Sequence, residues 1–463
     1  MANLNDYIFF KENKYVILRI VWSCIYIIFI VLTIGLVLSL WQEFLTNPTV
    51  TTLESTYLPV NKIPYPGIAI CNMNKISKKK ATVFAKHVAQ FTKLDVVEIV
   101  NKTQMLGKLY DFSYNKEDKP TISMLQNIVE KLQLNIITVM KMLTLQCEDL
   151  LLNCRWKGVD VNCSNIFKLR LTYDGYCCTF NYAKKTLHFH EGEMEDFPIT
   201  GEAGIDKGLS VTINNEIEDY MYAPLYSQGV TIQIFIPTDY PDKPSGSLTE
   251  IVGEVGTENF LKIKPTTVKT VGEVIKYPLN KRQCLFDEER PTKFNGVYSQ
   301  SDCNVDCRIA STLALCQCIP FMIPLSTTDS VCTLNNLACL HQYRNKWNFL
   351  YPEQDDLGLL QREQHDSLRC SQTCYPSCDA TLYDVVSERA IIHKHKSRNH
   401  TVVHIYYYNR FSNLYKHDVV YYWFEILSNF GGTFGLIIGL SLISIVECLL
   451  FMLQYLLNLK ILS

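Results

Sequence analysis

Residues 421–459 read YYWFEILSNFGGTFGLIIGLSLISIVECLLFMLQYLLNL, an almost entirely apolar stretch near the end of the 463-residue chain. As one straight helix it would extend roughly 58 Å at 1.5 Å per residue, against about 30 Å of bilayer hydrocarbon. A membrane-embedded helix of this length must tilt, project beyond the bilayer or break. We therefore expect a membrane segment that is more than a simple anchor.

The middle of this stretch combines closely spaced glycines with polar residues. Gly431, Gly435 and Gly439 repeat every four residues, a spacing that lets helices pack closely in a membrane, and packing alone would explain them. Three polar residues follow at intervals of three: Ser441, Ser444 and Glu447. On a helix this spacing places them within a sector of about 120°. Because an ionisable side chain in hydrocarbon is costly and by default functional, this sector is expected to face water.

The other long apolar segment, residues 20–41, is long enough to span a bilayer. A cleaved signal peptide would have an apolar region of about 7–15 residues, and Trp22 and Trp41 are placed like interfacial anchors, so a retained helix is favoured. Basic residues precede the segment and the next one after it is Lys62, which puts the N-terminus in the cytoplasm.

The predicted layout follows from these two segments. It comprises a short cytoplasmic N-terminus (1–19), a first transmembrane helix (20–41), a cysteine-rich extracellular region (42–420), an extended second membrane segment (421–459) and a cytoplasmic C-terminus (460–463). The protein is thus expected to be multi-pass in the plasma membrane, with both termini in the cytoplasm.

Composition narrows the functional classes. A formal net charge of −2 gives no case for nucleic-acid binding, and no HExxH, GxSxG or P-loop pattern supports enzyme activity. Sixteen of the eighteen cysteines fall between Cys71 and Cys378. Such a cluster between two apolar segments indicates an oxidising, extracytoplasmic compartment and disulfides.

The region between the membrane segments is predicted to mix helices and strands. Apolar runs and period-two alternation predict strands at 68–71, 230–236 and 402–408, the second one half-buried. Helical spacing predicts one helix starting at Ser77 and another within 122–145. Acceptor sequons for N-glycosylation begin at Asn101, Asn162 and Asn399.

The cysteines of residues 284–378 have the most specific spacing. Cys303 and Cys307 are four residues apart, which places them on one helix face, and Cys370 and Cys374 share that separation. If these two segments lie antiparallel, Cys303 pairs with Cys374 and Cys307 with Cys370, and Cys284–Cys378 lies outside them. Spacing alone does not fix connectivity. Zinc is disfavoured because no C-x₂-C pair occurs, so no metal site is predicted.

Several motifs together resemble the degenerin/epithelial sodium channel superfamily, and most closely its insect pickpocket-like subunits. The motifs are YPGIAICN at 65–72, GYCCTFN at 175–181, YSQSDC at 298–303, CQCIPFMIP at 316–324 and SNFGGTFGLIIGLS at 428–441. The resemblance covers nearly the whole chain. It implies two transmembrane helices flanking a large disulfide-rich mixed α/β ectodomain of palm, thumb, finger, knuckle and β-ball, with residues 284–378 in the thumb.

The resemblance also implies a function and its residues. The expected protein is a subunit of a homo- or heterotrimeric, amiloride-sensitive, sodium-selective channel in the lipid bilayer, without a cofactor. The implied selectivity filter is Gly439, Leu440 and Ser441. The implied pore and gate residues are Ser428, Gly432, Gly435, Ser444 and Glu447. The further implied disulfides are Cys71–Cys177, Cys154–Cys163, Cys316–Cys339 and Cys318–Cys332, and the remaining Cys147 and Cys178 are paired with each other.

Two departures from the family pattern keep alternatives open. The family carries a His-Gly pair before the first span, and no His-Gly dipeptide occurs in this sequence. The chain is then either incomplete at its N-terminus or a subunit that gates poorly alone. Leu440 is also bulkier than the usual middle residue of the filter. A non-conducting subunit or a two-pass surface receptor, and an ATP-gated channel of similar layout, are the rival hypotheses.

Overall fold

The computed structural model describes residues 4–92, 94–183, 198, 200, 202–290, 298–323, 330–348, 373–393, 399–439 and 441–461. The chain divides into two compact units. The first comprises Met1–Thr52, Thr270–Arg282 and His417–Ser463, and the second comprises Leu53–Lys269 and Gln283–Lys416. Each unit is described separately below.

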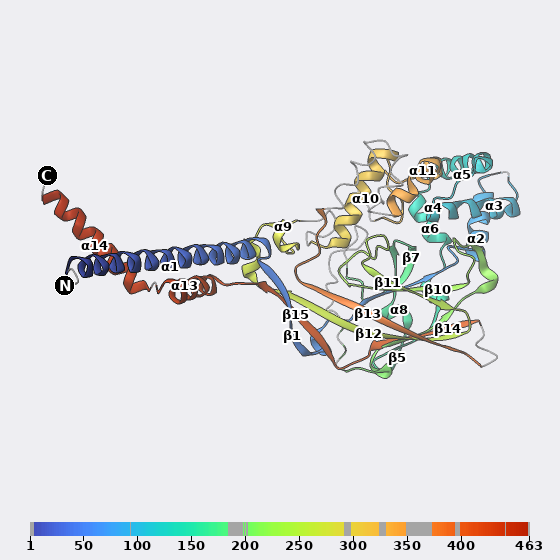
Figure 1. Cartoon of the computed structure of the whole chain (residues 1–463). Coiled ribbons are helices and arrows are strands. Elements are labelled where there is room, and N and C mark those ends of the chain that lie inside the picture. Colours follow the sequence, from blue (N-terminus) through green and yellow to red (C-terminus); the bar gives the residue numbers. More distant parts are fainter. Residues whose placement is uncertain are drawn as a thin grey trace. The chain divides into compact units, whose positions relative to one another are not determined.

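The first unit is mainly helical. Its elements are α1 (Leu4–Thr46), η6 (Gly272–Lys276), α9 (Leu279–Arg282), α13 (Trp423–Ile438) and α14 (Leu442–Ile461). α1 is one continuous helix that extends beyond the predicted 20–41 span, and α13 runs along it (Figure 1). Among the described residues, Leu18–Thr46 meets the length and composition of a membrane-spanning helix, with a mean hydropathy of 2.7.

The larger sheet has eight strands in the order β1-β15-β12-β14-β8-β4-β5, with β13 also paired to β12. Their bounds are β1 (Thr49–Pro59), β4 (Leu151–Trp156), β5 (Val159–Val161), β8 (Leu209–Asn214), β12 (Thr257–Thr270), β13 (Ala380–Ile391), β14 (His400–Tyr407) and β15 (Phe411–Val419). β14 includes most of the strand predicted at 402–408, and its residues alternate between buried and half-buried. This period of two shows that one face of β14 packs on a core.

The second sheet has five strands in the order β11-β10-β2-β7-β6. Their bounds are β2 (Gly67–Asn72), β6 (Lys168–Thr172), β7 (Gly175–Phe180), β10 (Gly229–Phe235) and β11 (Leu248–Glu254), and a separate ribbon pairs β3 (Ile76–Ser77) with β9 (Tyr220–Tyr222). The prediction of a half-buried strand at 230–236 was wrong in one respect, because every residue of β10 is buried. Thr231 and Gln233 of β10 bond Asp174, which satisfies polar groups on the second face.

One hydrophobic core joins the two sheets. It includes Leu209, Val211, Ile213, Leu261, Ile263 and Ile405 from the larger sheet and Ile68, Ile70, Val230, Ile232 and Ile234 from the smaller one. Tyr65 lies within this core, and its hydroxyl donates to the Ile405 carbonyl at 2.6 Å. The hydroxyls of Tyr383 and Tyr407 both donate to the Pro64 carbonyl, at 2.8 and 2.9 Å. These bonds fix the start of the YPGIAICN motif against the larger sheet.

A second core lies among helices of the second unit, which are drawn together in Figure 1. They are α2 (Lys78–Ala89), α3 (Val96–Thr103), η2 (Gln104–Gly107), α4 (Lys108–Asp111), η3 (Lys116–Asp118), α5 (Lys119–Lys131), α6 (Ile136–Leu143), α10 (Gln300–Cys316), η7 (Leu334–Asn336) and α11 (Leu337–Asn348). Short elements complete the unit: η1 (Val60–Lys62), α7 (Cys147–Leu150), α8 (Cys163–Ile166), η4 (Ile205–Lys207) and η5 (Ile217–Asp219).

Side-chain caps explain where these helices begin. Ser77 accepts from the Lys80 amide at 3.1 Å to start α2, and Asn135 accepts from the Ile137 amide at 2.9 Å to start α6. The helix expected within 122–145 is therefore two helices, α5 and α6, separated by Gln133 in the left-handed conformation (φ 52°). The predicted helix after Ser77 is confirmed as α2, in which Phe84 is buried and Val83 is 66% exposed.

Seven disulfides join described cysteines of the second unit, and each joins two cysteines that the sequence analysis paired. They are Cys71–Cys177, Cys147–Cys178, Cys154–Cys163, Cys284–Cys378, Cys303–Cys374, Cys316–Cys339 and Cys318–Cys332. Cys307 is also disulfide-bonded, and its expected partner Cys370 lies outside the described residues. Among the described side chains Cys24, on α1, is a free thiol.

Candidate ion pathway

The apolar C-terminal stretch begins with a helix start that polar groups stabilise. The Tyr422 amide donates to Glu425 Oε2 at 2.9 Å, and the Glu425 amide donates to the Tyr422 carbonyl at 3.0 Å. The Tyr422 hydroxyl donates to Asp418 Oδ1 at 2.9 Å. A carboxylate in the first turn is also favoured by the helix dipole. These contacts fix where the chain leaves β15 and enters α13.

The helical path is interrupted where α13 ends at Ile438 and α14 begins at Leu442. Gly439 has φ 73° and ψ 16°, and its amide donates to the Gly435 carbonyl at 3.1 Å. Glycine adopts this left-handed conformation without a Cβ penalty, which is why it commonly ends helices. Gly439 therefore explains the end of α13 in physical terms.

Ser441 explains the start of the second helix. Its Oγ accepts from the Ser444 amide at 3.2 Å and lies 3.0 Å from Ser444 Oγ. A hydroxyl that accepts from the third amide of a helix is an N-cap. The Gly-x-Ser sequence thus ends one helix and caps the next. Leu440, the middle residue of the expected filter, lies outside the described residues.

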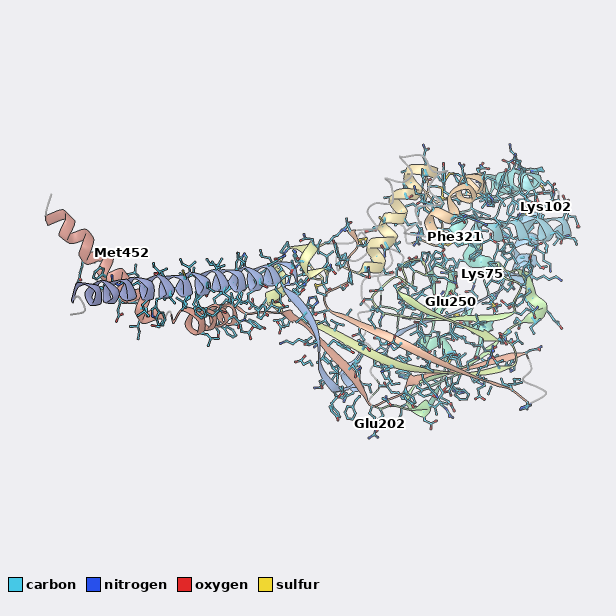
Figure 2. The ribbon with its side chains drawn as sticks, viewed as in Figure 1. Lys75, Lys102, Glu202, Glu250, Phe321 and Met452 are labelled. Atoms are coloured by element: carbon cyan, nitrogen blue, oxygen red, sulfur yellow. A yellow bond between two sulfur atoms is a disulfide. The ribbon has the colours of Figure 1, made fainter. Side chains whose placement is uncertain are left out.

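The remaining predicted pore residues lie on exposed faces of the single chain. Ser428, Gly432, Gly435 and Glu447 are exposed, and Ser444 is half-buried. A Cβ added at Gly431 or Gly432 would meet no atom within 4 Å. The described part of the chain therefore gives no intramolecular packing reason for glycine at these two positions. Met452, labelled in Figure 2, marks α14 beyond Glu447.

Aromatic contacts link α13 to the rest of the first unit. The Trp41 and Phe430 rings lie 6.4 Å apart between centroids, joining α1 to α13. The Phe44 and Tyr277 rings lie 6.5 Å apart, edge to face, joining α1 to the segment after η6. Such aromatic pairs contribute about 0.5–1.5 kcal/mol beyond their buried area. Movement of α1 or of the 270–282 segment would disturb these contacts.

Backbone bonds complete these connections next to α13. The Val420 amide donates to the Pro48 carbonyl at 2.8 Å, and the Val271 amide donates to the His417 carbonyl at 3.0 Å. Burial lowers the pKa of His417 below its ordinary 6.5, although Asp418 opposes this shift. His417 Nε2 is buried without a hydrogen-bond partner, so protonation of this ring would place a poorly solvated charge there.

The other predicted sites fall in the second unit. Asn101, Asn162 and Asn399 are exposed, which glycosylation requires. Asn162 Oδ1 also accepts from the Ser164 amide at 3.1 Å and caps α8. Among the described residues no group of three or more His, Cys, Asp or Glu side chains could hold a metal ion.

Comparison with known proteins gives the family. A sequence model described as "Amiloride-sensitive sodium channel" matches residues 6–451. The chain belongs to this family. Members of the amiloride-sensitive sodium channel family are ion channels, so the chain is a membrane protein with a disulfide-rich ectodomain and not an enzyme. The resemblance to the degenerin/epithelial sodium channel superfamily is thereby confirmed.

Individual relatives agree with this assignment. The chain is 24% identical to sodium channel protein Nach of Drosophila melanogaster, covering 94% of this chain and 82% of that protein. It is 24% identical to pickpocket protein 19 of the same species, covering 93% and 84%, and 23% identical to the bile acid-sensitive ion channel of Mus musculus, covering 94% and 82%. A solved proton-activated chloride channel aligns over 94% of this chain and 98% of that chain, at 8% identity. Its TM-score of 0.29 is too low to support a shared fold.

Sequence reasoning missed the caps of this site. Ser441 was assigned to the filter and to the polar sector with Ser444 and Glu447, but not to a helix cap, and its hydroxyl caps α14. A serine three residues before another polar residue at the start of an apolar run is the signal that could have revealed the cap. The contact between Trp41 and Phe430 had no such signal, because it joins residues far apart in the sequence.

Proposed function

We propose that the chain is a subunit of a trimeric, amiloride-sensitive, sodium-selective cation channel that is gated through its extracellular region. The observation that supports this proposal most is the interruption of an apolar helical segment between Ile438 and Leu442. Non-helical backbone at membrane depth is tolerated where it lines a water-filled path. The family membership makes a conduction path the natural reason for such an interruption.

In this proposal α13 and α14 together form the second membrane segment, and residues 439–441 form the selectivity filter. Carbonyls freed at the break replace part of a cation's hydration shell. Leu440 contributes through its backbone, so its bulky side chain is tolerated. Three copies of the chain, or this chain with related subunits, bring three such breaks around one axis.

The polar residues of this segment favour cations over anions in the pore. Ser441, Ser444 and Glu447 follow one sector of α14, and three copies of Glu447 form a carboxylate ring that attracts cations and repels anions. Ser428, Gly432 and Gly435 lie on α13, where we assign the gate and the narrow pore wall. Exposed glycines with open space at Cβ agree with close approach by a neighbouring subunit.

The topology follows from the same assignment. Residues 20–41 of α1 form the first span, residues 42–420 are extracellular, and both termini are cytoplasmic in the plasma membrane. The two sheets and the disulfide-bonded helices correspond to palm, β-ball, finger and thumb, with a knuckle as in the family. Disulfides and exposed sequons fit an extracellular location.

Current recording tests the proposal. The chain is expressed in oocytes alone and with a pickpocket-type relative, and current is measured with sodium, then potassium, as the external cation. We expect a sodium-preferring current that amiloride blocks. Current only with the relative would identify an accessory subunit, the second candidate. Lack of current in every combination, with the chain at the cell surface, would contradict the proposal.

A further inference from the structure

A large open cavity lies wholly within the second unit. Its volume is about 610 Å³, within the usual range for small-molecule sites. Its apolar and aromatic walls come from Met73, Tyr110, Tyr173, Pro224, Leu225 and Pro244. Lys75 and Glu250, both labelled in Figure 2, also line it. The cavity belongs to the ectodomain and is separate from the residues assigned to conduction.

Most charges around this cavity already have partners. Glu250 pairs with Lys243 at 2.9 Å. Both oxygens of Asp111 accept hydrogen bonds, Oδ2 from the Tyr222 hydroxyl at 2.8 Å and Oδ1 from the Ser113 amide at 3.0 Å. The Lys243–Glu250 pair is therefore neutral, and Asp111 keeps its negative charge but has hydrogen bonds to both of its oxygens.

Lys75 differs from these residues. Its backbone amide donates to the Tyr222 carbonyl at 2.7 Å, which fixes its position beside β9. Its ammonium lies 6.0 Å from the centre of the Tyr110 ring, a contact that is weak at this distance. Lys75 is half-buried as a residue, and no carboxylate of the described residues lies within ion-pair distance of its ammonium. A cation on the wall of a cavity that has no anionic partner can donate charge-assisted hydrogen bonds to the anionic group of a ligand.

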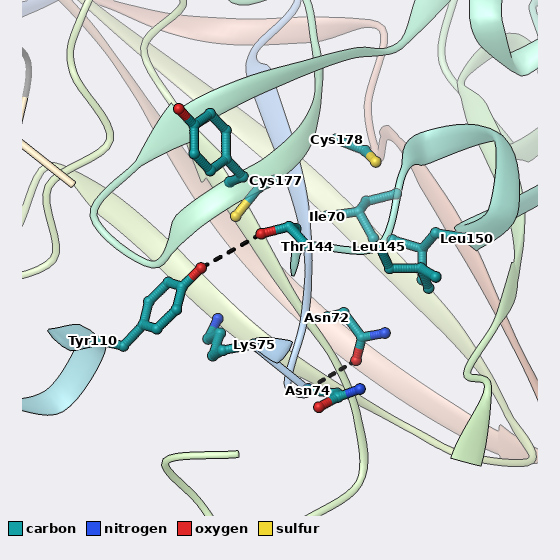
Figure 3. Close-up of a pocket in the computed structure, with 11 residues that line it drawn as sticks. Ile70, Asn72, Asn74, Lys75, Tyr110, Thr144, Leu145, Leu150, Cys177 and Cys178 are labelled. Atoms are coloured by element: carbon teal, nitrogen blue, oxygen red, sulfur yellow. Dashed lines mark hydrogen bonds between the residues drawn. The ribbon is translucent and has the colours of Figure 1, made fainter. Parts of the chain in front are cut away.

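Figure 3 shows Lys75 among the residues that line a second cavity, of about 10 Å³. That space fits a single water molecule, and Asn72 Nδ2 there has no hydrogen-bond partner. The small cavity can thus hydrate Lys75 but is too small for any larger anion. The large cavity, of about 610 Å³, has room for an organic anion beside Lys75.

Asp174 supplies the opposite charge. Its Oδ2 accepts from Gln233 Nε2 at 2.9 Å and from the Thr231 hydroxyl at 3.2 Å. No cation of the described chain pairs with it, and Oδ1 accepts no hydrogen bond there. Lys75 and Asp174 line the same cavity without forming an ion pair with each other. Lys75 and Asp174 are therefore opposite charges on the wall of one cavity, and Asp174 differs from Asp111 in having one oxygen that accepts no hydrogen bond from the described chain.

We propose that this cavity binds a zwitterionic ligand with an aromatic or apolar body, of the size of an amino acid or a slightly larger molecule. Its anionic group pairs with Lys75, its cationic group pairs with Asp174, and its body packs on Tyr110, Tyr173 and Leu225. A ligand that carries both charges satisfies both groups, whereas a ligand with one charge leaves the other group unpaired.

The walls of this site are attached to the thumb helices. The Tyr173 hydroxyl donates to Asn348 Oδ1 at 3.1 Å, at the end of α11. The Arg308 guanidinium on α10 lies 5.6 Å from the Tyr173 ring centre and pairs with Asp242, the neighbour of Lys243. A bound ligand would therefore contact residues that α10 and α11 hold in place, but binding itself does not depend on conduction.

The test is calorimetric titration of the full-length chain in detergent with three probes that share one aromatic body. L-Phenylalanine carries both charges, phenethylamine only the cation and 3-phenylpropionate only the anion. We expect L-phenylalanine to bind at least tenfold more tightly than either single-charge probe. Lys75→Met and Asp174→Asn should each weaken it at least tenfold, whereas Lys62→Met, a lysine exposed outside the cavity, should leave it unchanged.

A further variant controls for loss of binding through misfolding. Leu225 is 57% exposed, so Leu225→Trp should fold normally and obstruct the cavity, abolishing L-phenylalanine binding while the melting temperature stays within about 2 °C. No binding of L-phenylalanine to the wild-type chain, equal binding of all three probes, or binding unaffected by Lys75→Met would each overturn the proposal and leave a hydrated cleft. Because the readout is binding, failure here is distinct from failure of the channel assignment.

Discussion

The Gly439 amide donates to the Gly435 carbonyl at 3.1 Å while Gly439 itself adopts φ 73°. A residue with a Cβ would be strained there by about 1–2 kcal/mol. Gly439→Ala should therefore shift the helix end and move the reversal potential towards that of a less selective cation pathway. Gly35→Ala is the matched control, because Gly35 lies within α1 with open space at Cβ. An unchanged reversal potential in Gly439→Ala would contradict the role of the break.

Substitutions at Ser441 and Ser444 distinguish the effect of helix capping from the effect of a polar pore wall. Ser441→Ala removes the cap of α14 and should cost about 1 kcal/mol, whereas Ser441→Asp keeps an acceptor for the Ser444 amide. We expect the sodium preference to fall in Ser441→Ala and less in Ser441→Asp. Ser444→Ala, which retains the capping bond, should have the smallest effect. The order is read from sodium-to-potassium permeability ratios, and the opposite order would refute the capping explanation.

The contact between Trp41 and Phe430 predicts a gating effect of substitution on α1. Trp41→Ala removes the ring that lies 6.4 Å from Phe430 and should cost up to about 1.5 kcal/mol of helix association. We expect a change in single-channel open probability of up to about tenfold. Trp22→Ala, on the same helix but 63% exposed, is the control. Equal effects of the two substitutions would mean that the ring contact does not couple the helices.

The ion pair between Arg308 and Asp242 is buried, with side chains 4% and 0% exposed. Removing one partner of such a pair leaves an uncompensated charge and costs about 3–5 kcal/mol. Arg308→Met should therefore lower the melting temperature markedly, as measured by thermal denaturation of the purified chain. Arg155→Met breaks the exposed pair with Asp160 and should cost less than about 1 kcal/mol. Comparable losses would show that Arg308 is not the structural link between α10 and the β10–β11 connection.

His417 predicts a pH dependence. Because burial lowers its pKa in the folded chain, the unfolded chain takes up a proton first as the pH falls. Stability from this group is thus constant above about pH 6.5 and is lost as the pH falls below it. His417→Gln should flatten the dependence of melting temperature between pH 7 and 5. An identical pH profile for wild type and variant would rule out His417 as the titrating group.

Local patterns predicted much of the fold, and tertiary context explains the rest. The alternation of apolar and polar residues located β10 but did not predict that both of its faces are buried. One face packs in the core between the two sheets, and on the other face Thr231 and Gln233 hydrogen-bond to Asp174. One helix was predicted within 122–145, yet Gln133 turns the chain there at a residue with no strong turn preference, so that two helices form.

The candidate site shows the same division. Gly439 and Ser441 were assigned from the family resemblance, and their places at the two helix ends agree with the specific roles of glycine and serine there. The unpaired charges of Lys75 and Asp174 could not be located from sequence, since they come from separate segments that meet only in the folded cavity. Spacing suggested the pairs among residues 284–378 that lie outside the intervening loop, but it left the connectivity open, and the other cysteine pairs came from the family resemblance or from the cysteines that remained.

The most direct measurement of the central claim is thiol modification at Ser441. Ser441→Cys is made in a Cys24→Ser background, since Cys24 is exposed and free, and a positively charged methanethiosulfonate reagent is applied during sodium current. The account predicts a block that develops only in Ser441→Cys and that amiloride slows. Sodium current that persists unchanged, after chemical analysis has verified that the introduced thiol is modified, would contradict a conduction path at the interruption between α13 and α14.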